Sequence, residues 1–230
     1  MKDWKHTRTL ILIYRIILCL LVWTTLILMF YDGASKYPAA LDGFLRGLYA
    51  YRYYTMQTNL FVAIWLTLAI IFHFKPDKLA KIKGTIKGGL TIYIFITFVI
   101  FAIMLSDDYN PDKIISIFTN ITSHYVIPIL FFIDWMFTEK TVQYKWRNLG
   151  FWLIYPFLYL ILSIVHGTIT GKYLYPFLDI PTMGLGKYFL AIGILIIGYI
   201  ALGSIFVLSN RFLYRKLNPL EEEPEMKSEN

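Results

Sequence analysis

Six long apolar stretches limit what this chain can fold into more than any other feature. They cover residues 10–30, 54–74, 86–105, 114–137, 149–165 and 187–208. A helix rises about 1.5 Å per residue, so stretches of this length can cross a hydrocarbon core of about 30 Å. The fifth is the shortest and contains Pro156. The sequence therefore predicts an all-α polytopic membrane protein, a bundle of six transmembrane helices.

Composition agrees with a membrane protein. Of the 230 residues, 57% are hydrophobic and 16% are charged, which is typical of a polytopic bundle rather than of a soluble domain. We expect one helical domain, residues 1–210, followed by a polar, proline-broken cytoplasmic tail, residues 211–230, that stays disordered. The net charge of +7 is typical of lysines held at a cytoplasmic surface, so we expect no nucleic-acid partner.

Lysine and arginine are distributed unevenly between alternate connections. The N-terminus, the 75–87 loop, the 138–148 loop and the tail hold fifteen of them, and the opposite connections hold six. Cytoplasmic connections carry such an excess, which predicts a multi-pass protein of the cell membrane with both termini cytoplasmic. Near the inner ends of their spans, Arg15 is expected to reach the interface with its long side chain, and Asp134 to hold a local network.

The three outer connections contain turn and cap residues. Asp42 is a suitable N-cap for a short interfacial helix that leads into the second span. Asn110 and Pro111 form a cap and first-turn pair that predicts the start of the fourth helix. The third connection, residues 166–186, has enough glycine and proline to forbid a continuous helix.

Polar side chains within the spans gather toward the predicted outer half. His124 lies near the middle of the fourth span, four residues after Asn120, and an ionisable residue at membrane depth indicates a functional site. Further candidates for one pocket open to the outer leaflet are Thr55, Thr58, Asn59, His166, Tyr175 and Asp179. The alternative is structural, because Thr often bonds its own helix and Asn often bonds a neighbouring one.

The sequence contains no motif for a metal or a cofactor, and we expect neither. A Walker loop, GxGxxG, HExxH and GxSxG are all missing. His124 and His166 have no companion at HxxxH spacing, and the nearby carboxylate is a single Asp179, which argues against zinc. A single cysteine, Cys19, excludes an intrachain disulfide.

Three blocks resemble the androgen-induced, FAR-17a-type family of six-span membrane hydrolases and related bacterial proteins of the Pr-six-Pr type. They are RYYTMQTNL at 52–60, SHYVIPILFFID at 123–134 and VHGTITGKYLYPFLD at 165–179. The third is the most specific, and in it Asp179 stands where the family often has Glu. The resemblance extends thinly over nearly the whole chain.

The resemblance implies a threonine nucleophile and a histidine partner that act on fatty acid esters. The matching residues are Thr55 and His124. A histidine within hydrogen-bond reach can take the proton of a threonine hydroxyl near pH 7, and Asn59, Asn120 or a backbone amide can donate to the developing oxyanion. The expected partner is a membrane lipid or fatty acyl ester.

Two other functions fit the same residues. A small transporter or lipid-binding protein would line a path with His124, Asn120 and Asn59, and a purely structural membrane protein would use the polar residues for packing.

The depths of Thr55 and His124 in the membrane limit how the two residues can interact. Counted from the expected inner ends at residues 74 and 137, Thr55 and His124 differ by roughly 9 Å. We therefore expect a shared outer-half cavity without a direct hydrogen bond, and Thr58 as the alternative nucleophile.

Overall fold

The computed structural model describes residues 2–36, 42–75, 78–79, 83–107, 109–139 and 142–218. Within these ranges the chain is helical and forms no strand, as predicted. Six helical stretches are long and apolar enough to cross a membrane, and each coincides with one of the six predicted spans. They are His6–Ser35, Tyr54–Ile71, Gly84–Leu105, Ile114–Thr138, Trp146–Thr170 and Leu185–Leu217.

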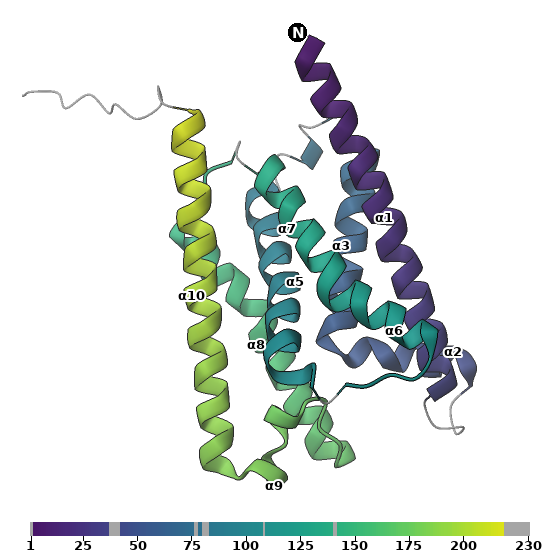
Figure 1. The fold of residues 1–230 in the computed structure, drawn as a ribbon. Coiled ribbons are helices and arrows are strands. Elements are labelled where there is room, and N and C mark those ends of the chain that lie inside the picture. The colour runs from purple at the N-terminus through teal and green to yellow at the C-terminus, as the bar shows by residue number, and fades with distance from the viewer. Residues whose placement is uncertain are drawn as a thin grey trace, which may run out of the picture.

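The spans are built from the helices labelled in Figure 1. Four of the spans are formed by a single helix, and the third and fourth spans include turns of π-helix. The elements are α1 Lys2–Lys36, α2 Gly43–Tyr49, α3 Tyr54–Ile71, π-turn Lys83–Lys87, α5 Gly88–Ile100, π-turn Phe101–Leu105, α6 Ile114–Ile121, π-turn Thr122–Val126, α7 Ile127–Thr138, α8 Trp146–Thr170, a 3-10 turn Pro176–Leu178, α9 Ile180–Met183 and α10 Leu185–Leu217.

Local sequence explains where several of these helices begin and end. The Asp42 carboxylate accepts the amide hydrogen of Leu45 at 2.8 Å, so the predicted cap of α2 is confirmed. Gly171 ends α8 with a left-handed φ of 67°, a conformation that favours glycine. The predicted start of the fourth helix at Asn110 and Pro111 is wrong, whereas the span itself begins at Ile114 as predicted. The helix begins there because the preceding segment is largely exposed and Lys113 is extended.

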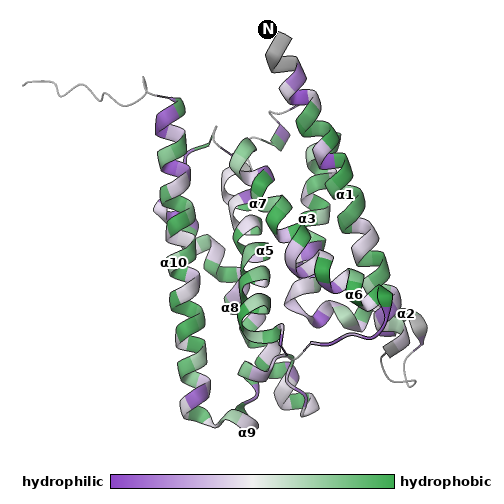
Figure 2. Ribbon diagram, in the orientation of Figure 1, coloured by the Kyte–Doolittle hydropathy of each residue, from purple (hydrophilic) through white to green (hydrophobic). Residues whose placement is uncertain are grey.

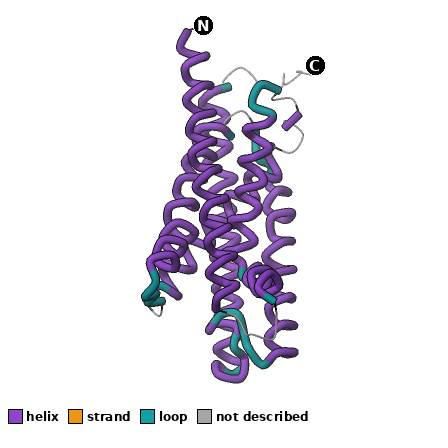
Figure 3. The backbone as a smooth tube through the Cα atoms, turned by 90° about the vertical axis from the view of Figure 1, so that its right-hand side faces the viewer, coloured by secondary structure: helices purple, strands orange, loops and turns teal. Residues whose placement is uncertain are grey.

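Most of the long helices run roughly along one common axis, with connections at the two ends (Figure 3). The start of α1 and the end of α10 lie at the same end, and α2, α9 and the connection between α5 and α6 lie at the opposite end (Figure 1). Helix α1 packs on α2, α3, α6 and α7, whereas α5 packs on α3, α7, α8 and α10. Hydrophobic residues cover most of the helix length (Figure 2).

Two cores hold the bundle. One is mainly aliphatic and joins α1, α3, α5 and α7 through residues such as Leu18, Val22, Val62 and Ile127. The other is aromatic and joins α5, α7, α8 and α10 through Trp135, Tyr144, Trp152, Tyr199 and Phe206. Apolar side chains on the outward faces stay exposed, as expected of a surface that faces lipid.

The last helix differs from the predicted domain boundary. Helix α10 continues to Leu217, so residues 211–217 of the expected tail are helical. Residues 219–230 of that tail lie outside the described residues.

Candidate functional site

A cavity of about 1050 Å³ opens among α3, α5, α6, α8 and α10. Apolar side chains form most of its wall, including Phe101, Phe157 and Leu202. Four of the predicted site residues line it together: Thr55, Asn120, His124 and Tyr175. One cavity therefore brings together four of the eight predicted site residues, and the other four do not line it.

Thr55 and His124 are in direct contact in this cavity. Thr55 Oγ1 lies 3.2 Å from His124 Nε2. Thr55 is the second residue of α3, and the helix start is held because the Tyr54 amide donates to the hydroxyls of Tyr159 and Tyr175, at 3.0 and 3.1 Å. The nucleophile candidate is thus carried on a fixed helix end.

The ring of His124 is oriented by its own helix. Its Nδ1 lies 3.1 Å from the backbone oxygen of Asn120 and 3.2 Å from Ser123 Oγ. A carbonyl oxygen can only accept, so in the neutral ring Nδ1 carries the proton and Nε2 presents its lone pair to Thr55. Phe101 stacks on the ring with centroids 3.8 Å apart and an interplanar angle of 20°. This is the tautomer that a general base for Thr55 requires.

The position of His124 depends on the π-turn Thr122–Val126, in which Ile127 N–H donates to the Thr122 carbonyl. Pro128 accounts for this turn. A proline ring clashes with the carbonyl four residues earlier, here that of His124, and a wider turn relieves the clash. The extra residue in this turn changes the direction of every side chain before it.

The expectation that Thr55 and His124 lie too far apart for a hydrogen bond is wrong. It counted depth from residues 74 and 137, but α3 ends at Ile71 and α7 at Thr138. Thr55 precedes its helix end by sixteen residues and His124 by fourteen. A difference of two residues is roughly 3 Å along the axis. The fourth span also crosses the bundle obliquely (Figure 1).

Tyr175 lies beside the Thr55 side chain at the start of α3. Its hydroxyl accepts the Tyr54 amide hydrogen at 3.1 Å, as the neighbouring Tyr159 hydroxyl does at 3.0 Å. Tyr159 donates its single proton to the Arg52 carbonyl at 3.0 Å. Burial raises the pKa of Tyr175 well above its usual value, so the phenol stays protonated and remains a donor at neutral pH.

Thr58 and Asn59 face away from the cavity and brace the pair instead. The Thr58 hydroxyl lies 3.1 Å from Thr97 Oγ1 and donates to the Thr55 carbonyl at 3.2 Å. The Asn59 amide donates to the carbonyls of Thr55 and Ser123, at 2.8 and 3.3 Å. Neither residue lines the cavity, so Thr58 is not placed as the alternative nucleophile and Asn59 is not placed as an oxyanion donor.

His166 and Asp179 also lie outside the cavity wall. His166 Nε2 is 3.3 Å from the Tyr49 hydroxyl, and its Nδ1 is 3.0 Å from the Lys172 carbonyl. Asp179 caps α9 by accepting from the backbone and the hydroxyl of Thr182, at 3.2 and 2.9 Å. Both residues order the connection between α8 and α10, which carries Tyr175.

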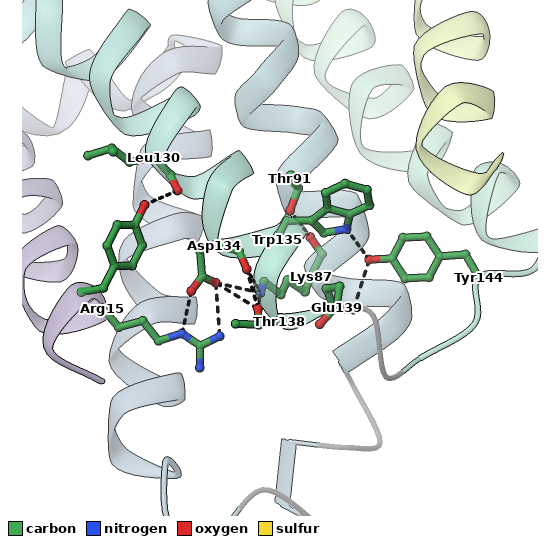
Figure 4. Close-up of polar contacts among 10 residues, drawn as sticks. Arg15, Lys87, Thr91, Leu130, Asp134, Trp135, Thr138, Glu139 and Tyr144 are labelled. Carbon is green, nitrogen blue, oxygen red and sulfur yellow. Dashed lines mark hydrogen bonds and ion pairs between the residues drawn. The ribbon is translucent and has the colours of Figure 1, made fainter. Parts of the chain in front are cut away.

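A buried ionic cluster lies toward the other end of the bundle (Figure 4). Asp134 Oδ1 is 2.8 Å from Arg15 Nε, and Asp134 Oδ2 is 2.7 Å from Lys87 Nζ. Lys87 Nζ also donates to Thr138 Oγ1. The local network expected around Asp134 is present, but Arg15 is buried against it instead of reaching the interface.

Sequence reasoning missed Lys87. It was counted with the lysines of the 75–87 loop, yet it is fully buried in a π-turn of the third span. The signal that could have placed it is its position in the sequence, since Lys87 directly precedes Gly88 and the apolar run that follows. Lys87 therefore ties α5 to α7, and Arg15 ties α1 to the same carboxylate.

Comparison with known proteins finds no matching family model, no matching curated protein and no matching solved structure.

Proposed function

We propose that this protein is a membrane-embedded hydrolase of lipid acyl esters, with Thr55 as the nucleophile and His124 as the general base. The observation that carries the proposal is the 3.2 Å contact between Thr55 Oγ1 and His124 Nε2 at the wall of a large apolar cavity. The Asn120 carbonyl supports the proposal, because it accepts the proton on His124 Nδ1 and so leaves Nε2 unprotonated and able to act as the base.

The reaction has two steps. In the first, His124 Nε2 takes the hydroxyl proton while Thr55 Oγ1 bonds to the ester carbonyl carbon, and collapse of the tetrahedral intermediate releases the alcohol, which takes the proton back from His124. In the second, His124 takes a proton from water, which attacks the acyl-threonine ester. The fatty acid leaves, and Thr55 regains its proton.

The oxyanion needs a donor beside the reacting carbon. The Tyr175 hydroxyl is next to Thr55 and stays protonated. The Asn120 side chain also lines the cavity, and its Nδ2 is the group that can donate to an oxyanion. Fixed donors of this kind stabilise charge that develops in the transition state. We assign Tyr175 as the first donor and Asn120 as the second.

An acyl ester suits the cavity. Its volume of about 1050 Å³ is at the upper end of the range of ligand pockets, about 300–1,000 Å³, and its wall is mostly apolar. A long acyl chain fills such a space, while the ester group meets the few polar side chains at Thr55.

The proposal includes the membrane and the orientation of the chain within it. Fifteen of the chain's lysines and arginines fall in the four predicted cytoplasmic segments and six in the opposite connections. By the positive-inside rule both termini face the cytoplasm of the cell membrane. Thr55 and Tyr175 then face the outer leaflet, and the substrate enters from there.

Covalent labelling tests the chemistry. The purified chain is treated in detergent with a fluorophosphonate probe, and the modified residue is identified by mass spectrometry. We expect the probe on Thr55, loss of the label in Thr55→Ala and His124→Ala, and retention in Thr55→Ser. Thr58→Ala is the control for the alternative nucleophile and keeps the label, because Thr58 does not line the cavity and its bond to Thr55 is to the backbone carbonyl, not to Oγ1.

Hydrolysis of a p-nitrophenyl acyl ester gives an independent measurement. Loss of the base in His124→Ala is expected to lower the rate about 100-fold to 10,000-fold. Each variant is first checked for a monodisperse elution profile. A label that persists in Thr55→Ala, or uptake of acyl ester without cleavage, contradicts the hydrolase and favours a transporter or lipid-binding protein.

A further inference from the structure

A second hollow lies at the end of the bundle that carries the chain termini. It is a groove between the start of α8 and the last turns of α10, lined by Trp146, Leu208, Arg211, Phe212 and Arg215. These five residues are called the terminal groove. It lies outside the wall of the cavity that holds Thr55 and His124.

The terminal groove combines two cations with an apolar strip. Arg211 and Arg215 are four residues apart on α10, so their side chains share one face and are separated by about 6 Å along the axis. Leu208 continues this face toward the middle of the helix, Phe212 lies between the two arginines along the axis, and both apolar side chains are largely exposed. Trp146 lies across from them at the start of α8 and is also exposed.

The groove is preformed because α10 is fastened beside it. The buried side chain of Asn210 accepts the Tyr144 amide hydrogen at 2.8 Å and donates to the Glu139 carbonyl at 3.0 Å. These bonds hold the segment before Trp146 against the residue that precedes Arg211. About two turns earlier, Gly203 lets α10 approach Leu149 of α8, where a Cβ would meet Leu149 at 2.4 Å.

We propose that the terminal groove binds the phosphate of an anionic phospholipid. Charge complementarity points to a phosphate, since guanidinium groups bind it with paired hydrogen bonds. The position points to a lipid. Trp146 is an interfacial residue type at the end of a membrane-spanning helix, and Leu208 and Phe212 lie where the acyl chain of a lipid seated on the arginines would run. Basic pockets between helix ends are a known kind of site for anionic headgroups.

Quenching of tryptophan fluorescence tests this site directly, since Trp146 is part of it. The full chain is reconstituted in phosphatidylcholine vesicles that contain a dibrominated-acyl lipid, either phosphatidylglycerol or phosphatidylcholine. The chain has six tryptophans, so the Trp146 contribution is the difference between wild type and Trp146→Phe. We expect brominated phosphatidylglycerol to reach half-maximal quenching at a lower mole fraction than brominated phosphatidylcholine. The difference is expected to be about fivefold for each arginine.

The variants separate a specific site from general attraction to a charged surface. Arg211→Gln with Arg215→Gln is expected to abolish the preference for phosphatidylglycerol, while Arg147→Gln keeps it. Arg147 is exposed at the same end and does not line the groove. Millimolar inorganic phosphate is expected to leave the preference unchanged. Equal quenching by the two lipids in wild type, a preference that survives the double variant, or its removal by free phosphate overturns the proposal.

Discussion

Tyr175 is the residue whose role in the proposed reaction can be isolated most cleanly, because a single oxygen atom carries it. Its hydroxyl lies beside the Thr55 side chain, and Tyr175→Phe removes that oxygen without changing the ring. A hydrogen bond to a group that becomes charged contributes about 1.5–3 kcal/mol, so we expect the rate of acyl-probe labelling to fall roughly 10-fold to 100-fold.

Tyr173→Phe is the matched control for this change. Tyr173 packs on Gly167 and does not line the cavity, so labelling is expected to stay at the wild-type rate. If both variants label at the wild-type rate, Tyr175 is not a donor to the reacting centre, although Thr55 would remain the nucleophile.

Asp134 contacts both Arg15 and Lys87 in the buried cluster. Asp134→Asn keeps the shape but leaves two buried cations without this charge. Removing one partner of a buried ion pair costs about 3–5 kcal/mol, and we expect a fall of that size in the free energy of unfolding, measured by denaturant titration in detergent.

Two comparisons test the ionic explanation. Asp134→Asn combined with Lys87→Met is expected to lose less than the sum of the single changes, because the two residues are in contact. Asp112→Asn, at an exposed position between α5 and α6, is expected to change stability by no more than about 0.5 kcal/mol. Additive losses in the double variant would mean that the cluster acts through packing alone.

At the scale of elements, Gly88 fixes how closely α5 packs on α8. A Cβ at this position would lie 2.5 Å from the Trp152 ring and 2.8 Å from the Tyr144 hydroxyl. Both rings are buried and cannot swing away. Gly88→Ala is therefore expected to lower the free energy of unfolding by about 1–3 kcal/mol.

Gly193→Ala gives the contrasting result for the same chemical change. Gly193 lies within α10, and nothing within 4 Å would meet its Cβ. We expect stability equal to wild type or higher by up to about 1 kcal/mol, since alanine is the better helix former. Thermal unfolding of the two variants in one detergent checks the difference. Equal losses would mean that α5 and α8 are not in tight contact.

The six spans were predictable from sequence because burial in lipid requires long apolar runs, and the Asp42 cap follows from a local rule. The contact between Thr55 and His124 was not predictable, because it depends on where α3 ends and on the π-turn before Pro128. A shift of a few residues in either helix changes the relative depth of the two side chains by about one helical turn. Lys87 was misassigned because its partner Asp134 is distant in sequence and only the fold brings them together.

Over the whole molecule, the two halves of the bundle differ in packing. Toward the termini, the Asp134 cluster joins α1, α5 and α7, and Asn210 fastens α10 to the segment before α8. Toward the opposite end, α8 and α10 line a cavity instead of closing on each other. A bundle fixed at one end and hollow at the other can admit a lipid without losing its fold, which agrees with a hydrolase whose substrate arrives from the membrane.

The orientation of the bundle decides which leaflet supplies that lipid, and two exposed lysines at opposite ends measure it. Lys172 lies in the connection that carries Tyr175, and Lys216 lies in the last turn of α10. The chain has one cysteine, Cys19, which is buried, so Cys19→Ala gives a background without thiols. In spheroplasts we expect Lys172→Cys to react with a membrane-impermeant maleimide, and Lys216→Cys to react only after permeabilisation.

The outcome follows from charge, because lysine and arginine near short connections stay on the cytoplasmic side. The chain with its native Cys19 is the control and is expected to remain unlabelled in both conditions. If Lys216→Cys reacts in intact spheroplasts and Lys172→Cys does not, the termini face outward and the cavity opens to the inner leaflet. The substrate of Thr55 would then come from the inner leaflet. The terminal groove would face the outer leaflet and would have to bind an anionic lipid of that leaflet.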